Sequence, residues 1–201
     1  MKYYKRKDCI YCKSTQLEKF LSLGFHPPSN SFILPDETSK EERFPLNVYF
    51  CCNCSLAQLT DIVSGDSIFD DYHYLSSSSK ALVNHFSQMT KDITKRFNLK
   101  SGDLVIDIGC NDGITLNNYP VLDLVKVGVE PSNVASIAQA QGLNIIKSFF
   151  SGNVAEKIFN DYGKAKIITA TNVFAHIDDM HSFMKGIPKI LDDEGYDLVS
   201  S

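Results

Sequence analysis

Short apolar runs alternate with helical patterns throughout the second half of the chain. The runs are bounded by glycine, aspartate or serine, which is typical of buried parallel strands rather than of helices. They cover residues 104–108, 125–129, 143–146, 167–171 and 196–201. Because strands that alternate with helices form parallel sheets, this pattern predicts a doubly wound α/β domain.

Helix signals separate most of these strands. Three segments open with a residue type that caps helix N-termini: 132–141 with Ser132, 151–162 with Ser151, and 178–187 with Asp178. Proline interrupts helices, so Pro188 is expected to end the third segment near residue 187. For the same reason, Pro120 limits the helix after the first strand to about two turns.

A longer amphipathic helix is predicted ahead of the first strand, over residues 80–97. Its apolar residues recur at intervals of three and four, and they are Leu82, Phe86, Met89, Ile93 and Phe97. Four consecutive serines at 76–79 precede it, and the last of them can cap the helix. Apart from the cap, this serine run is typical of a flexible linker.

The first part of the chain has a different pattern. Residues 44–50 alternate apolar and polar positions, and residues 56–59 follow a cysteine pair, so we expect a strand, a turn and a returning strand. Residues 16–23 form a short amphipathic segment that Gly24 is expected to stop.

A glycine-rich turn follows the strand at 104–108. Gly109 and Gly113 lack a Cβ, so the backbone can turn sharply there and approach a ligand closely. Ligands of doubly wound sheets bind beyond the carboxyl ends of the strands. The turn therefore marks the candidate ligand site, and a plain structural turn with incidental acidic residues is the alternative.

Charge indicates which ligand suits this turn. Dinucleotide sites use Gly-x-Gly-x-x-Gly, but here the spacing is Gly-x-x-x-Gly, with Asp107 before it and Asp112 inside it. Two carboxylates oppose a pyrophosphate but suit S-adenosylmethionine (SAM), which carries an ammonium and a sulfonium group. Glu130 ends the second strand, where an acidic residue can accept hydrogen bonds from ribose hydroxyls. The expected cofactor-binding residues are Asp107, Gly109, Asn111, Gly113, Glu130 and Asn172.

Five of the six cysteines lie in the first part of the chain. Two Cys-x-x-Cys pairs, Cys9 with Cys12 and Cys51 with Cys54, can place four thiolates around a zinc ion. Such a site has no open coordination position, so we expect a structural zinc that helps a small domain to fold. Free or redox-active cysteines are the alternative. Cys52 can replace a neighbour as ligand, but its spacing is less suitable.

Charge and hydropathy exclude some functions. A formal net charge of −4 argues against broad binding to nucleic-acid phosphates. No apolar run is long enough to span a membrane, and the basic N-terminus lacks the apolar region of a signal peptide. We therefore expect a cytoplasmic protein without nucleic-acid or membrane partners.

Several motifs together resemble the sugar C-methyltransferases that act on nucleotide-linked ketodeoxysugars. They are the paired cysteine motifs, His-Pro-Pro-Ser-Asn-Ser-Phe at 26–32, Tyr-His-Tyr-Leu-Ser-Ser-Ser-Ser at 72–79, Asp-Ile-Gly-Cys-Asn-Asp-Gly at 107–113, Val-Glu-Pro-Ser at 129–132 and Asn-Val-Phe-Ala-His-Ile-Asp-Asp at 172–179. Many methyltransferases share the glycine loop. The combination with the zinc motif and the Tyr/Ser segment is far more specific.

The resemblance implies a zinc-binding α+β domain over residues 1–79, a connecting helix over 80–98 and a Rossmann-like class I methyltransferase domain over 99–201. The resemblance implies proteins of three domains: a zinc-binding domain, a SAM-binding domain and a C-terminal domain that completes the sugar site. The C-terminal domain is expected to supply the general base for the reaction. That domain has no counterpart in this sequence, so we expect a truncated chain with an incomplete sheet and doubtful activity alone. The oligomeric state cannot be inferred.

The resemblance also implies the substrate chemistry. A base removes a proton from the carbon beside a ketone, and the methyl group of SAM is then transferred to that carbon. Tyr72, Tyr74 and His176 are the expected catalytic residues, and Ser77 and Ser78 are expected to bind the substrate diphosphate. Two alternatives stay open: O- or N-methylation of another small molecule, and a non-catalytic protein that binds zinc and SAM.

Overall fold

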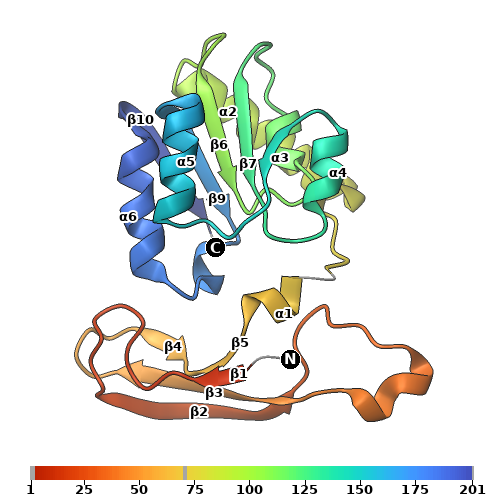
Figure 1. Cartoon of the computed structure of the whole chain (residues 1–201), viewed down its shortest axis with the longest axis vertical. Helices are drawn as coiled ribbons and strands as arrows, with labels where there is room; N and C mark the ends of the chain where they lie inside the picture. The colour runs from red at the N-terminus through yellow and green to blue at the C-terminus, as the bar shows by residue number, and fades with distance from the viewer. Residues whose placement is uncertain (1–2, 70–71, 201) are drawn as a thin grey trace. The chain divides into compact units, whose positions relative to one another are not determined.

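The computed structural model describes residues 3–69 and 72–200, and its chain divides into two compact units between Tyr72 and His73 (Figure 1). Residues 1–2, 70–71 and 201 lie outside the described part. The expected first domain ended at residue 79, whereas the serine run and the following helix belong here to the C-terminal unit.

The N-terminal unit contains two small antiparallel sheets. One has the strand order β2-β3-β4 and the other pairs β1 with β5. The elements are β1 (Tyr3–Lys5), β2 (Leu17–His26), the 3-10 helix η1 (Pro35–Lys40), β3 (Phe44–Cys51), β4 (Ala57–Leu59), β5 (Asp61–Val63) and α1 (Gly65–Phe69). The predicted strand, turn and returning strand are thus confirmed as β3 and β4.

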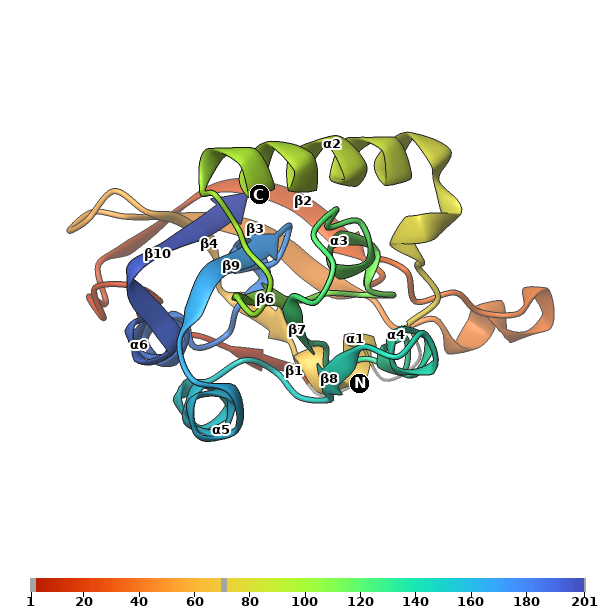
Figure 2. The same ribbon diagram turned by 90° about the horizontal axis from the view of Figure 1, so that it is seen from above.

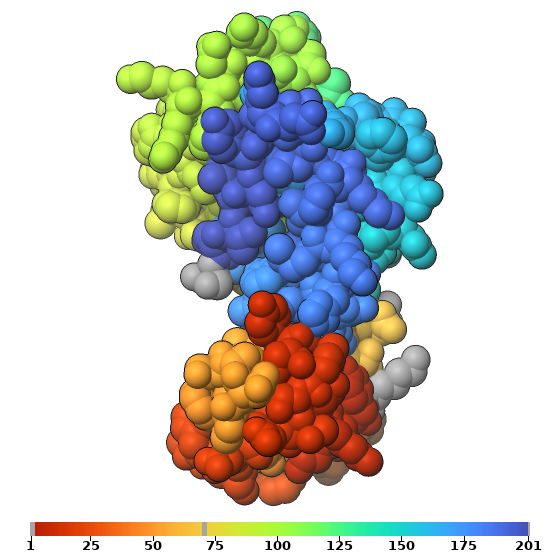
Figure 3. All heavy atoms as spheres, turned by 90° about the vertical axis from the view of Figure 1, so that its left-hand side faces the viewer, coloured from red at the N-terminus to blue at the C-terminus, as the bar shows by residue number. Residues whose placement is uncertain are grey.

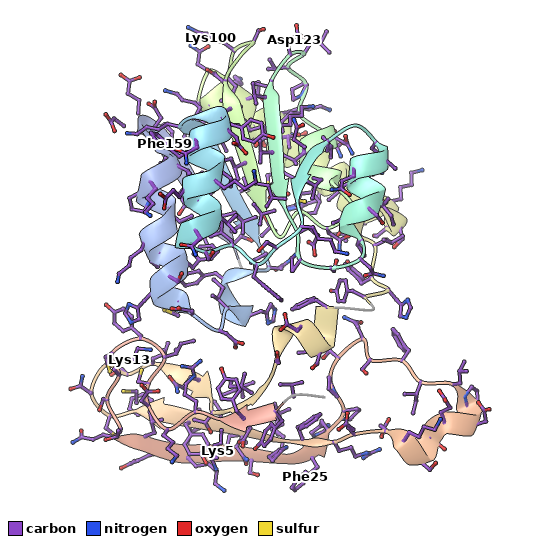
Figure 4. The ribbon with its side chains drawn as sticks, in the orientation of Figure 1. Lys5, Lys13, Phe25, Lys100, Asp123 and Phe159 are labelled. Atoms are coloured by element: carbon purple, nitrogen blue, oxygen red, sulfur yellow. The ribbon has the colours of Figure 1, made fainter. Side chains whose placement is uncertain are left out.

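Gly24 does not stop the segment before it, contrary to expectation. Strand β2 runs on to His26, because Gly24 takes a left-handed φ of 86° and the pairing with β3 becomes irregular between Ser22 and Phe25. Beyond this irregularity, Phe25 resumes pairing with Pro45. Its side chain is largely exposed and is labelled in Figure 4.

The C-terminal unit is built on a five-stranded parallel sheet with the order β10-β9-β6-β7-β8. Its elements are η2 (Ser76–Ser78), α2 (Lys80–Arg96), β6 (Leu104–Ile108), α3 (Ile114–Asn117), β7 (Val125–Val129), α4 (Ala135–Ala140), β8 (Asn144–Ile146), α5 (Gly152–Tyr162), β9 (Ala165–Thr171), η3 (Phe174–His176), α6 (Met180–Ile190) and β10 (Leu191–Ser200). The predicted doubly wound fold is confirmed.

Helices cover both faces of this sheet. Figure 2 shows α2 and α3 on one side of the strands and α5 and α6 on the other. Each face has its own core: Ile93 of α2 packs with Val105 of β6, and Phe183 of α6 packs with Ile106 of β6. The strands are buried on both faces, which explains why their sequences are continuously apolar and do not alternate apolar and polar residues.

The order of the strands in the sheet changes side at β6, although all of the strands are parallel. From β6 the chain proceeds through β7 to β8 on one side, and β9 and β10 then lie on the other side of β6. Crevices form at such switch points beyond the carboxyl ends of the strands. The glycine turn at 109–113 follows β6 at that position.

Two helices differ from the expected bounds. Helix α4 begins at Ala135 rather than at 132, because the Ser132 hydroxyl accepts from Val134 N and closes a preceding turn instead. Helix α6 is capped by Asp179 rather than Asp178 and continues past Pro188 to Ile190. Pro188 removes one backbone donor, but the burial of Ile190 against the sheet holds the last turn in place.

Strand β10 forms an outer edge of the sheet and begins earlier than the predicted 196, while Ser201 lies outside the described residues. Its pairing with β9 is irregular between Leu191 and Tyr196, where a Cβ on Gly195 would lie 2.7 Å from the carbonyl oxygen of Ala165. Figure 3 shows β10 and α6 in blue at the surface of the C-terminal unit. None of the helices within residues 3–69 and 72–200 combines the length and the apolar character of a membrane-spanning segment.

Candidate functional site

The glycine turn is closely packed at both of its glycines. Gly109 has a left-handed φ of 71°, and a Cβ there would lie 2.3 Å from Val173 Cγ2. Gly113 has a φ of 83°, and its Cβ would lie 2.4 Å from Leu143 Cδ1. Gly109 N also donates to the carbonyl of Val129 over 2.7 Å, which ties the turn to β7. Only glycine fits these positions without displacing neighbours.

Asp107 lies within β6 and is almost completely buried. The hydroxyl of Thr169, its register partner on β9, donates to Asp107 Oδ1 over 2.6 Å. Burial raises the pKa of Asp107 to about 6, although the hydroxyls of Thr169 and Thr115 oppose that shift. A cationic group beside Asp107 would favour the ionised carboxylate.

Glu130 is fixed by two backbone donors. Its Oε2 accepts from Asn111 N over 2.9 Å and its Oε1 accepts from Ser132 N over 3.0 Å. Glu130 is 5% exposed, and each carboxylate oxygen keeps a further lone pair. It can therefore accept additional hydrogen bonds from neighbouring hydroxyl groups.

Asp112 is the third carboxylate at the turn. Its Oδ2 accepts from Ser77 N over 2.9 Å, while its buried Oδ1 has no hydrogen-bond partner among the described residues. A buried carboxylate oxygen without a partner is costly unless a ligand supplies one. Together with the buried carboxylates of Asp107 and Glu130 at the same turn, it fits a ligand with cationic and hydroxyl groups, as expected for SAM.

The Tyr/Ser segment is joined to the glycine turn by side-chain hydrogen bonds. Asn111 Nδ2 donates to the carbonyl of Tyr74 over 3.0 Å, and Asn111 Oδ1 accepts from Ser76 N over 2.9 Å. The structure thus brings Tyr74 and Ser77, which are distant in sequence, to the predicted cofactor loop. The Ser78 hydroxyl donates to the Leu75 carbonyl instead.

The other predicted residues occupy separate places. Asn172 follows β9 with a left-handed φ of 56°, and its N donates to the carbonyl of Ser200. His176 ends the exposed turn η3. Tyr72 belongs to the N-terminal unit, where its ring lies 5.3 Å from that of Phe69.

The four predicted cysteines gather in the N-terminal unit. The sulfurs of Cys9, Cys12, Cys51 and Cys54 all lie within 4.8 Å of one another. Cys9 Sγ and Cys54 Sγ are 3.6 Å apart, and Cys12 Sγ and Cys51 Sγ are 3.5 Å apart. A tetrahedral zinc with Zn–S bonds of about 2.3 Å requires sulfur–sulfur distances of about 3.8 Å. The cluster therefore fits a zinc ion held by four thiolates.

The two cysteine motifs close in the same way. Lys13 N donates to the carbonyl of Cys9, and Ser55 N donates to the carbonyl of Cys51. Both donors have a left-handed φ, and Lys13 is labelled in Figure 4. The side chain of Asn53 and the backbone of Ser14 lower the pKa of Cys12 to about 6. At Cys54 a backbone hydrogen bond from Leu56 opposes the shift, but burial and the neighbouring thiols raise the pKa to about 12. Zinc binding favours the thiolate form of its cysteine ligands.

Residues outside the cluster clarify its boundaries. Cys52 is exposed and does not belong to the group of four. The His26 ring forms a hydrogen bond with the carbonyl of Leu23 and does not belong to the group of four either. Gln58 was not expected: its buried amide accepts from Ile10 N and donates to the carbonyl of Asp8, which holds the first motif against β4.

Comparisons with known proteins identify two domain families in this chain. A family described as a methyltransferase domain matches residues 83–201, and one described as a zinc binding domain matches residues 9–69. The C-methyltransferase NovU of Streptomyces niveus is 29% identical over 94% of this chain and 45% of its own length. The chain thus spans about half the length of this curated relative.

Solved structures of similar fold include SAM-dependent methyltransferases from two bacteria. The Clostridium acetobutylicum protein has a TM-score of 0.46 at 19% identity, covering 58% of this chain and 49% of its own. The Geobacter sulfurreducens protein, in complex with S-adenosyl-L-homocysteine (SAH), has a TM-score of 0.42 at 16% identity, covering 56% and 47%.

Proposed function

We propose that this chain, which belongs to the methyltransferase-domain family, methylates carbon in a nucleotide-linked ketodeoxysugar. Its methyltransferase domain follows a zinc-binding domain in the sequence. The observation that carries the proposal is the grouping of three buried carboxylates, Asp107, Asp112 and Glu130, around a glycine turn at the carboxyl end of β6. The motifs at 72–79 and 172–179 and the similarity to a C-methyltransferase support carbon as the acceptor.

In this proposal the carboxylates divide the recognition of the cofactor between them. Glu130, held by two backbone amides, accepts the ribose hydroxyls. Asp107 and Asp112 face the cationic end, while Gly109 and Gly113 allow the left-handed backbone turn that brings these groups to the ligand. Asn111 and Asn172 complete the cofactor site. When bound, SAM supplies an electrophilic methyl group.

The substrate residues would act on the sugar. Tyr74 and Tyr72 donate hydrogen bonds that stabilise negative charge on the ketone oxygen when the neighbouring carbon loses a proton. His176 orients the sugar or moves a proton, and Ser77 and Ser78 bind the diphosphate. These roles rest on the resemblance and on the hydrogen bonds that tie residues 74–77 to the turn.

The cytoplasm is the compartment that we propose. A four-cysteine cluster binds zinc only when its thiols are reduced, and cytosolic conditions keep thiols reduced.

Calorimetric titration with SAH tests the cofactor site. We expect wild-type chain to bind, and Asp107→Ala and Glu130→Ala to weaken binding at least tenfold, a loss of about 1.4 kcal/mol or more. Glu156→Ala, on the exposed face of α5, is the matched control. Unchanged affinity in both site variants would overturn the assignment.

The position of the transferred methyl group tests the substrate proposal. The chain is incubated with isotopically methyl-labelled SAM and a nucleotide-linked ketodeoxyhexose, and the product is examined by NMR. A methyl group on the carbon beside the ketone supports the proposal. A methyl group on oxygen or nitrogen would refute it.

A further inference from the structure

A single side chain joins the glycine turn to the Tyr/Ser segment on both of its polar atoms. Asn111 accepts from Ser76 N with Oδ1 and donates to the carbonyl of Tyr74 with Nδ2. These two backbone groups lie two residues apart, so the side-chain amide of Asn111 bonds the segment at both positions. Asp112 adds the third hydrogen bond, from Ser77 N.

The same residue is also bonded to the acidic side of the site. Asn111 N donates to Glu130 Oε2, while the Asn111 side chain holds the Tyr/Ser segment. Asn111 has a left-handed φ of 50°, which turns its amide N–H and its side chain toward different partners. A continuous path of hydrogen bonds therefore runs from Glu130 through Asn111 to Tyr74.

We infer that Asn111 and Asp112 are positioning residues that couple cofactor binding to the placement of Tyr74. This inference rests on the proposed cofactor site and assigns Asn111 a role beyond contact with the cofactor. A ligand held by Glu130 restrains the Asn111 backbone, and the restrained side chain keeps residues 74–77 in place. By reciprocity, a substrate that holds this segment raises affinity for the cofactor.

The coupling predicts a change in local opening. Ser76 N and Ser77 N are protected only while their bonds to Asn111 and Asp112 persist, so their hydrogen exchange reports whether the segment is attached. Bound SAH should slow exchange at both amides by roughly 5- to 150-fold, the usual range of coupling between sites.

Hydrogen exchange of the full chain, with and without SAH, is the experiment that tests this. Asn111→Gly is the informative variant, because glycine accepts the left-handed backbone and only the side chain is lost. In it, we expect fast exchange at Ser76 N and no effect of SAH there, while Ser77 N keeps its bond to Asp112. Asn160→Ala, exposed on α5, should behave as wild type.

Gly102 N is the internal reference amide. It donates to the carbonyl of Asp123 in a turn that precedes β6, at the opposite end of the strand from the glycine loop, and Figure 4 labels Asp123 and the neighbouring Lys100 there. Equal slowing at Gly102, Ser76 and Ser77 would mean general stabilisation and would overturn the coupling. An SAH effect at Ser76 N that is the same in Asn111→Gly and wild type would also overturn it.

Calorimetry on the same samples separates the two proposals. Wild-type chain that does not bind SAH refutes the cofactor site and the coupling together. Binding without a change at Ser76 N and Ser77 N refutes the coupling alone and leaves the cofactor site standing.

Discussion

Thr169 and Asp107 face each other on adjacent parallel strands, and the Thr169 hydroxyl donates to Asp107 Oδ1 over 2.6 Å inside the sheet. The hydroxyl also lies 3.3 Å from the carbonyl of Ile106. A buried carboxylate is thereby stabilised at the point where β6 enters the glycine turn. Two predictions depend on this pair.

Thr169→Val should destabilise the C-terminal unit. Valine has nearly the same shape but cannot donate, so Asp107 keeps its burial and loses a partner. The expected loss is about 1–3 kcal/mol of unfolding free energy, measured by chemical denaturation. Thr171→Val, two residues further along β9 and less buried, is the control. Equal stability of the two variants would show that the hydrogen bond contributes nothing.

The raised pKa of Asp107 predicts how stability depends on pH. Its pKa of about 6 in the folded state exceeds the ordinary value of 3.8 for an aspartate, because burial disfavours the ionised form. The protonated folded state is therefore favoured at low pH, and that contribution is lost as the pH rises from about 4 through about 6. Over this window, wild type should lose up to about 3 kcal/mol relative to Asp107→Asn. Parallel stability curves for the two proteins would contradict this.

Gly109→Ala should be far more damaging than Gly142→Ala. Both glycines have a left-handed φ, so each substitution costs about 1 kcal/mol from backbone strain. At Gly109 the new Cβ would also lie 2.3 Å from Val173 Cγ2, whereas nothing lies within 4 Å of it at Gly142. We expect Gly109→Ala to lose SAH binding, measured by calorimetry, while Gly142→Ala keeps it. Similar affinities would exclude close packing at Gly109.

Zinc removal should unfold the N-terminal unit and leave the parallel sheet of the C-terminal unit folded. We expect about one zinc per chain by elemental analysis, because four thiolates complete the coordination. Chelation, or Cys9→Ser, should expose residues 3–69 to proteolysis. Cys52→Ser, which alters an exposed cysteine outside the cluster, should retain zinc. Loss of zinc from Cys52→Ser would mean that the ligand set is different.

The sequence anticipated features that depend on local chemistry. Apolar runs located all five parallel strands, and Ser151 caps α5 as expected, since its hydroxyl accepts from Val154 N. The two Cys-x-x-Cys motifs located the cysteine cluster, because short loops bring their own sulfurs together. The roles proposed for Tyr72, Tyr74 and His176 remain predictions.

Features that depend on tertiary contacts were not predicted. The prediction that Pro188 ends the helix near residue 187 was wrong, because burial of Ile190 outweighs the loss of one helix hydrogen bond. Thr169 and Gln58 stood out only as polar residues within apolar strands, and their partners are distant in sequence. The serine run was predicted to be a linker, because no neighbouring residue in the sequence indicates that Asn111 and Asp112 form hydrogen bonds with its backbone.

The interrupted pairing of β2 has a consequence for solubility. This strand forms one edge of its sheet and is exposed along nearly all of its length, and Phe20 and Phe25 are 60% and 65% exposed. A regular edge of this kind would recruit strands from other molecules and seed fibrils. The irregularities after Lys19 and Ser22 break the ladder of unpaired amides into short pieces. An incoming strand therefore finds no continuous template along this edge, which limits edge-to-edge aggregation of the folded N-terminal unit.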